Sequence, residues 1–123
     1  MLADVPALDP LALAQSAAAL AEAEAAFAYA VDRLWAERAS GDGAILRDVG
    51  GLPRELRRRL ARRAITETRA RHAITAPAWS EATNIEPLLD SLEAGARATQ
   101  SGVMISPRGD SWTIDKAPPR RSL

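Results

Sequence analysis

The alternation of apolar and polar positions predicts three helices and about three short strands. The first helix begins at Asp9-Pro10, a capping acid followed by a residue suited to the first helical position, and continues to Ala39, before Gly41 and Gly43. At about 100° per residue, its larger apolar side chains form one stripe. That stripe contains Leu13, Ala17, Leu20, Phe27, Val31, Leu34 and Trp35. Glu24 lies in the middle of it, where a charge is unexpected.

The second helix is predicted from Pro53 to about Arg71, and it is rich in arginine. Its narrow apolar stripe consists of Leu52, Leu56, Leu60 and Ala64. The opposite side of the helical wheel carries Arg54, Arg58, Arg62 and Arg69. Two further charged residues, Arg63 and Glu67, fall on the leucine side. This helix, like the first, therefore places charge where hydrocarbon is expected to be buried.

The remaining elements are shorter. Residues 44–49 are predicted to form a strand, residues 72–81 a loop, and a third helix starts near Thr83 or Asn84. The third helix is expected to bury Ile85, Leu88, Leu89, Leu92 and Ala96. Residues 102–106 and 111–115 alternate around the turn 107–110, which predicts a β-hairpin. Its core face would hold Val103, Ile105, Trp112 and Ile114.

We therefore predict an α+β domain with three helices packed on a small, roughly three-stranded antiparallel sheet. The 123 residues suffice for one domain, expected at 10–116, with a linker at 1–9 and a disordered tail at 117–123. The sequence has no cysteine, no signal peptide and no apolar run long enough to cross a bilayer. A soluble, cytoplasmic protein that does not bind membranes is the expectation.

Formal charge is zero overall but unevenly distributed. Residues 1–43 hold seven acids and two arginines, whereas residues 44–75 hold nine arginines and three acids. Six arginines occur within residues 54–63 alone. An arginine-dense segment indicates a polyanionic partner or a matching acidic surface.

The misplaced charges on the two long helices suggest an ion pair. An unpaired Glu24 in an apolar stripe would be destabilised by several kcal/mol, and Arg63 could bind it bidentately. We predict a Glu24–Arg63 bridge that fixes the helix crossing, with Glu67 on the other side of the guanidinium. The alternative is a wet stripe edge at which both side chains reach solvent.

The face formed by Arg54, Arg58, Arg62 and Arg69 has two interpretations. Guanidinium groups one helical turn apart can each bind a backbone phosphate. Alternatively, this is the solvated side of a helix in a protein with one lysine among sixteen cations. The helix lacks aromatic residues for base stacking, which favours contact with nucleic-acid backbone and shape over single-strand recognition.

Catalytic chemistry is scarce. The single histidine, His72, has no nearby pattern of acids and is expected at the surface. The glycines at 41, 43, 50 and 51 do not connect a strand to a helix in the order of a phosphate-binding loop. We predict no catalytic residue, no metal site and no cofactor in this chain.

The order of these features resembles the region that follows the catalytic domain in bacterial tRNA(Ile)-lysidine synthases. The resemblance rests on the acidic stretch Leu20–Glu24, the Leu52–Ile65 helix, the leucines at 88, 89 and 92, and the hairpin from Gly102 to Trp112. Arg62-Arg63 and Trp112 are its sharpest points. It covers essentially the whole chain.

This resemblance implies a function. Such PP-loop enzymes use ATP to adenylate the wobble cytidine of an isoleucine tRNA, which lysine then converts to lysidine. Their Ser-Gly-Gly-x-Asp-Ser signature is absent here. The chain would therefore be a tRNA-binding, substrate-positioning domain that contacts tRNA through Arg54, Arg58, Arg62 and Arg69. ATP, with Mg²⁺, would act in a catalytic domain in cis.

Two other classes remain open. One is a non-enzymatic interaction module, a homodimer in which the acidic first helix of one copy binds the arginine-rich helix of another. The other is a stand-alone domain with an unrecognised enzymatic role, which would require a clustered pocket of titratable side chains.

Overall fold

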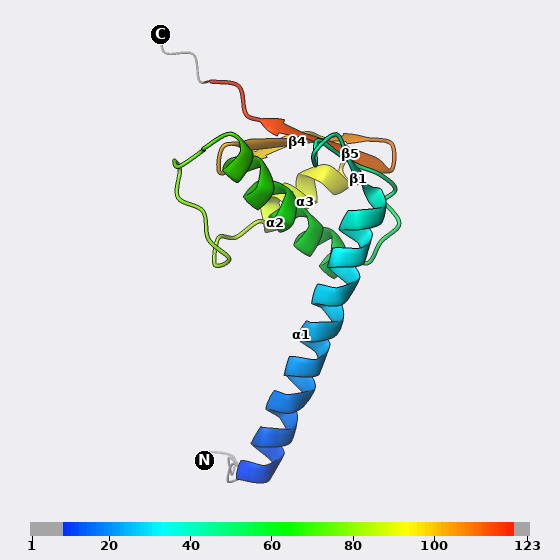
Figure 1. Cartoon of the computed structure of the whole chain (residues 1–123), viewed down its shortest axis with the longest axis vertical. Coiled ribbons are helices and arrows are strands. Elements are labelled where there is room, and N and C mark those ends of the chain that lie inside the picture. Colours follow the sequence, from blue (N-terminus) through cyan, green and yellow to red (C-terminus); the bar gives the residue numbers. More distant parts are fainter. Residues whose placement is uncertain (1–8, 120–123) are drawn as a thin grey trace, which may run out of the picture.

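The computed structural model describes residues 9–119, in which three helices lie on one side of a five-stranded antiparallel sheet (Figure 1). In chain order the elements are α1 (Pro10–Arg38), β1 (Ala39–Ser40), β2 (Ile45–Leu46), α2 (Arg54–Arg71), α3 (Glu86–Glu93), β3 (Ala98–Gln100), β4 (Val103–Arg108) and β5 (Ser111–Lys116). The strands lie in the order β1-β2-β5-β4-β3. The α+β class and the three helices are confirmed, and the sheet is larger than predicted.

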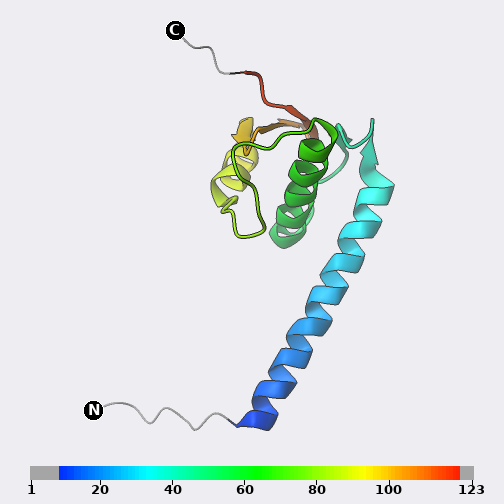
Figure 2. The ribbon, with the colours of Figure 1, turned by 60° about the vertical axis from the view of Figure 1, so that its left-hand side comes forward.

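Helix α1 begins as its sequence predicts. The Asp9 carboxylate accepts a hydrogen bond of 3.0 Å from the Leu11 amide, and Pro10 occupies the first turn. Most of the helix then extends away from the body (Figure 2). The alanine-rich sequence accounts for helix formation there, because alanine has the highest intrinsic helix propensity.

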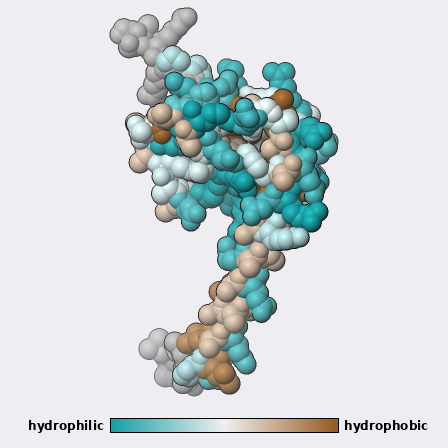
Figure 3. Space-filling model, viewed as in Figure 1, coloured by the Kyte–Doolittle hydropathy of each residue, from teal (hydrophilic) through white to brown (hydrophobic). Residues whose placement is uncertain are grey.

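Burial of the whole apolar stripe of α1 was a wrong prediction. Val31 is buried and Leu34 packs against the core, whereas Leu13 and Leu20 are 50% and 69% exposed. Apolar residues line the protruding half, while the body is mainly hydrophilic at its surface (Figure 3). The stripe extends beyond the domain because the elements that could cover it end near the C-terminal part of α1. No helix within residues 9–119 is both long and apolar enough to cross a membrane.

One core lies between the sheet and α2, α3 and the end of α1. Its fully buried large side chains include Leu46, Leu60, Ile65, Leu89 and Ile105. The predicted core positions Ile85, Leu88, Leu92, Val103, Trp112 and Ile114 are buried as well. Ala96 is exposed, because α3 ends at Glu93 and residue 96 lies in the connection to β3.

The predicted hairpin is β4–β5, and Arg108 pairs with Ser111 across a two-residue turn. Gly109 has a φ of 60°, which suits the first position of a type II′ turn. The strand predicted at 44–49 is confined to Ile45–Leu46. Strands β1 and β3, which have two and three residues, were not predicted from the sequence. The predicted linker 1–9 and tail 117–123 lie mostly outside the described residues, so those boundaries stay predictions.

Candidate nucleic-acid interface

The arginines at the start of α2 contact the acidic side of α3. Arg54 lies 3.2 Å from Glu86, 3.0 Å from Asp90 and 2.5 Å from Glu93, in each case nitrogen to carboxylate oxygen. Arg58 binds Glu86 through both Nε and Nη2, at 2.7 and 2.9 Å, and also pairs with Glu55. These contacts connect two helices that are adjacent on the same side of the sheet.

These contacts shift the pKa values of the paired residues. The hydrogen bonds from Arg58, reinforced by those from Arg54, lower the pKa of Glu86 to about 2. The pKa of Glu93 is lowered mainly by its hydrogen bond with Arg54. In turn, the hydrogen bonds with Glu86 raise the pKa of Arg58. Glu86 and Glu93 are therefore ionised at neutral pH and pair with Arg54 and Arg58 as carboxylates.

The other two members of the predicted arginine face bind backbone carbonyls. Arg69 is buried, and its Nη1 donates a 2.6 Å hydrogen bond to the carbonyl of Ser101. Arg62 donates from Nη2 to the Thr83 carbonyl at 2.9 Å. Its Nη1 is buried without a partner among the described residues, and its guanidinium lies 5.8 Å from the ring centroid of Trp79. A cation–π contact of this kind partly offsets the unpaired donor.

The predicted Glu24–Arg63 bridge is not formed. Glu24 binds Arg59 instead, at 2.6 and 3.1 Å, and Arg63 binds Asp32 at 2.6 Å. The way in which α1 crosses α2 explains the difference. Asp32 lies about two turns beyond Glu24 on α1, and Arg63 lies one turn beyond Arg59 on α2, so each acid faces a different arginine. The predicted contact between Arg63 and Glu67 is present at 3.0 Å. The bond with Arg59 lowers the pKa of Glu24, which is an exposed residue and not part of a buried stripe.

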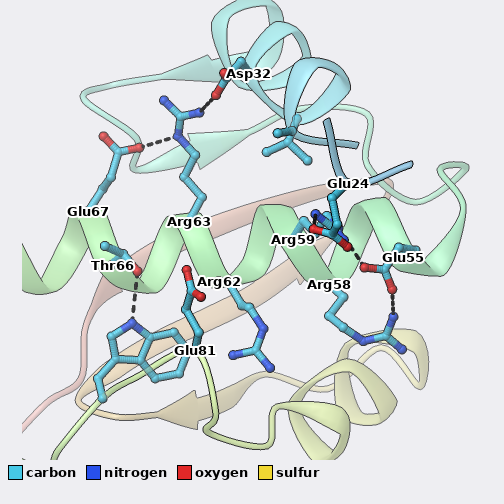
Figure 4. Close-up of a pocket in the computed structure, with 13 residues that line it drawn as sticks. Glu24, Asp32, Glu55, Arg58, Arg59, Arg62, Arg63, Thr66, Glu67 and Glu81 are labelled. Carbon is cyan, nitrogen blue, oxygen red and sulfur yellow. Dashed lines mark hydrogen bonds and ion pairs between the residues drawn. The ribbon is translucent and has the colours of Figure 1, made fainter. Parts of the chain in front are cut away.

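A groove of about 570 Å³ lies between α1, α2 and the loop after α2 (Figure 4). Its charged lining alternates in sign, with Glu24, Asp32, Glu55, Glu67 and Glu81 beside Arg58, Arg59, Arg62 and Arg63. Trp79 forms one wall, and its Nε1 donates to the Thr66 hydroxyl at 3.0 Å. Among the arginines lining the groove, Arg62 has no carboxylate partner within residues 9–119. The groove therefore presents little free positive charge to an anion.

The ion pairs of the α2 arginines differ from both interpretations of the sequence. The arginines of α2 were predicted either to bind phosphate or to be solvated, and most have acidic partners in the same chain. The signal was present in the sequence, because Glu86, Asp90 and Glu93 recur at helical spacing on α3. The role of Arg54, Arg58, Arg62 and Arg69 in tRNA binding stays a prediction. Self-association through α1 and α2 is also untested, and Glu24 and Asp32 of α1 already pair with α2 within one chain.

The rest of the structure offers little catalytic chemistry. His72 caps the end of α2 and is exposed, as expected. In the part of the chain that the structure describes, no group of three or more histidines, cysteines or acids is arranged to hold a metal ion. The groove has acids and arginines, but it contains no nucleophile paired with a base.

Comparison with known proteins links the chain to one synthase. It is 35% identical over 123 residues to the tRNA(Ile)-lysidine synthase of Novosphingobium aromaticivorans, an alignment that covers 99% of the chain and 36% of the relative. The chain is homologous to a part of that synthase. The resemblance drawn from the sequence is therefore confirmed, and the coverage is consistent with a C-terminal domain of such a protein. No family model matches the chain, and no solved structure matches it significantly.

The homologous region is only part of the relative. The chain spans about a third of the length of the synthase that it matches. The similarity therefore supports a domain of a lysidine synthase, and the activity of a whole synthase does not follow from this domain alone.

Proposed function

We propose that this chain is a tRNA-binding domain that positions tRNA for lysidine synthesis by a catalytic domain in cis. The observation that carries the proposal is the similarity of the whole chain to part of a tRNA(Ile)-lysidine synthase. ATP and Mg²⁺ would act in the catalytic domain, and the whole protein would act in the cytoplasm.

The physical contribution of such a domain is orientation. A catalytic domain that modifies one base requires that the rest of the tRNA be held in a fixed position. The ion pairs from α2 to α3 and α1 connect all three helices through charged groups. Together with the core, these contacts would hold the three helices in one arrangement when RNA is bound.

The prediction that follows is direct binding of tRNA by this chain. A fluorescently labelled isoleucine tRNA transcript should show increased anisotropy on addition of the protein, with an affinity that falls as salt is raised. Non-specific binding through phosphates has dissociation constants of roughly 10⁻⁴–10⁻⁶ M, so binding should be detected at low salt. An absence of binding at about 100 µM protein and 50 mM salt would contradict the proposed function.

A further inference from the structure

The sheet has one face without helices. The three helices lie on the opposite side of the sheet (Figures 1 and 2). Leu46, Ile105 and Trp112 are buried in the core on that side. Alternation along each strand directs their neighbours outward. This outer face includes Ser40, Ile45, Thr99, Met104, Ser106, Ser111, Thr113 and Asp115.

Strand register brings arginines together at one end of this face. Arg108 pairs with Ser111, whose hydroxyl accepts a hydrogen bond from the Asp48 amide. Strand β2 ends at Leu46, which pairs with Trp112, and extension of this register by one residue would place Arg47 opposite Ser111, on the other side from Arg108. Two strand spacings of about 4.8 Å would therefore separate the backbones of Arg47 and Arg108. The Arg47 amide also donates to the Arg38 carbonyl, which places a further arginine beside them.

A third exposed arginine lies along the same sheet. Arg97 directly precedes β3, and extension of the Ala98–Ile105 register by one residue would place Arg97 opposite Ser106. Ala98 packs against the core, so the adjacent Arg97 belongs to the outer side. We refer to Arg47, Arg97 and Arg108 as the sheet-face arginines.

The sheet-face arginines differ from those of α2 in their partners. Within residues 9–119, none of the three forms an ion pair with a carboxylate. Arg47 uses one donor, Nη2, on the Glu37 carbonyl at 3.1 Å, and all three residues are exposed. Asp115 is the acid on this face, while Asp48 and Asp110 lie in the turns at its end. The three arginines against Asp115 leave two positive charges on the strands of this face, and Asp48 and Asp110 offset this excess at the end where Arg47 and Arg108 lie.

Hydroxyl groups fill the positions between the arginines. Ser106, Ser111 and Thr113 lie on neighbouring strands of the outer face. Serine and threonine hydroxyls, together with arginine, are common donors to phosphate oxygens. The outer positions of the described strands carry no aromatic residue, and Trp112 points inward. Since base stacking requires an aromatic platform, the face suits the sugar–phosphate backbone of a folded stem better than exposed bases.

We propose that the outer face of the sheet, through Arg47, Arg97 and Arg108, is the surface that contacts the phosphate backbone of RNA. The proposal rests on the proposed function, and it replaces the α2 arginines as the principal contact. RNA binding there leaves the ion pairs of α2 intact. Binding on α2 would instead require Arg54 and Arg58 to leave their carboxylate partners.

Matched double variants test the surface. Arg47→Gln with Arg108→Gln removes two charges from the outer face, and the control Arg33→Gln with Arg71→Gln removes two exposed charges from α1 and α2. Affinity for the isoleucine tRNA transcript should fall roughly tenfold in the first variant at low salt, with the salt slope reduced by about two. The control should stay within about twofold of the unsubstituted chain.

A gain-of-affinity variant excludes misfolding as the explanation. Asp115→Asn removes the acid from the outer face and should tighten RNA binding roughly two- to fivefold at low salt. Equal affinity for the outer-face double variant and its control would overturn the assignment of the surface while leaving RNA binding intact. An unsubstituted chain that binds no tRNA would instead overturn the proposed function. An unchanged affinity in Asp115→Asn would also contradict the outer-face proposal.

Discussion

The arginines of α2 and those of the sheet's outer face differ in what their guanidinium groups contact. On α2, Arg54 and Arg58 bind carboxylates of α3, and Arg59 and Arg63 bind carboxylates of α1. The sheet-face arginines have no carboxylate partner among the described residues. Density of arginine in a sequence therefore does not identify a phosphate-binding surface. The charge that remains after intramolecular pairing is the better guide.

The strongest test of the structural role of α2 is Arg69→Ala. This side chain is buried, and its loss would leave the Ser101 carbonyl without its donor. We expect the free energy of unfolding to fall by about 2–3 kcal/mol. The exposed neighbour Arg71→Ala should change it by less than about 0.5 kcal/mol. Chemical denaturation measures both values, and equal effects would show that the buried bond contributes little.

Acid should weaken the contact between α2 and α3. The pKa of Glu86 is lowered from 4.5 to about 2, so its ion pairs contribute fully to stability above pH 4.5. That contribution is lost as pH falls from 4.5 towards 2, because protonated Glu86 no longer pairs with Arg58. Thermal melting at pH 7 and pH 3 should show a smaller decrease in Tm for Glu86→Gln than for the unsubstituted chain. A decrease of the same size would contradict a role for Glu86.

The ion pair between α1 and α2 should contribute less to stability than the buried Arg69 hydrogen bond. Asp32 pairs with Arg63 at an exposed position, and exposed ion pairs contribute little. Asp32→Asn is therefore expected to lower the free energy of unfolding by less than about 1 kcal/mol. Ala36→Ser, one turn further along α1, serves as a nearby exposed control. A larger loss of stability in Asp32→Asn than in Arg69→Ala would contradict the expectation that the exposed Asp32–Arg63 pair contributes less than the buried Arg69 hydrogen bond.

Removal of sheet-face arginines should have the smallest effect on stability. Arg97→Gln breaks no hydrogen bond or ion pair that the described structure forms, so its Tm should stay within about 2 °C of the unsubstituted value. Differential scanning fluorimetry measures this value. A large decrease in Tm would indicate that the outer face is part of the fold and not a free surface.

How well the sequence predicts a helix or strand of this domain depends on the length of that helix or strand. Helix α2 and the β4–β5 hairpin are long enough to show periodicity. The core residues of the hairpin were predicted correctly, as were Leu60 and Ala64 of α2, whereas Arg69 was placed on the opposite face and is buried. The strands Ala39–Ser40 and Ala98–Gln100 are too short to alternate detectably. Their pairing depends on neighbours that are distant in the sequence, which local patterns do not encode.

Charged contacts were predicted less well for a geometric reason. A helical wheel shows which face carries charge, but it does not show how far one helix is displaced along another. That displacement pairs Glu24 with Arg59 and brings Asp32 to Arg63. The sheet-face arginines come from three separate segments, so they form no run in the sequence. Only strand register brings them onto one surface.

The central comparison is tested most directly by measuring tRNA affinity and Tm for two double variants with equal charge loss. We predict that Arg47→Gln with Arg108→Gln loses affinity and keeps its Tm. Arg54→Gln with Arg58→Gln should lower the Tm and keep its affinity at temperatures at which it remains folded. The reverse pattern, with affinity lost in the α2 variant and retained in the outer-face variant, would contradict the account.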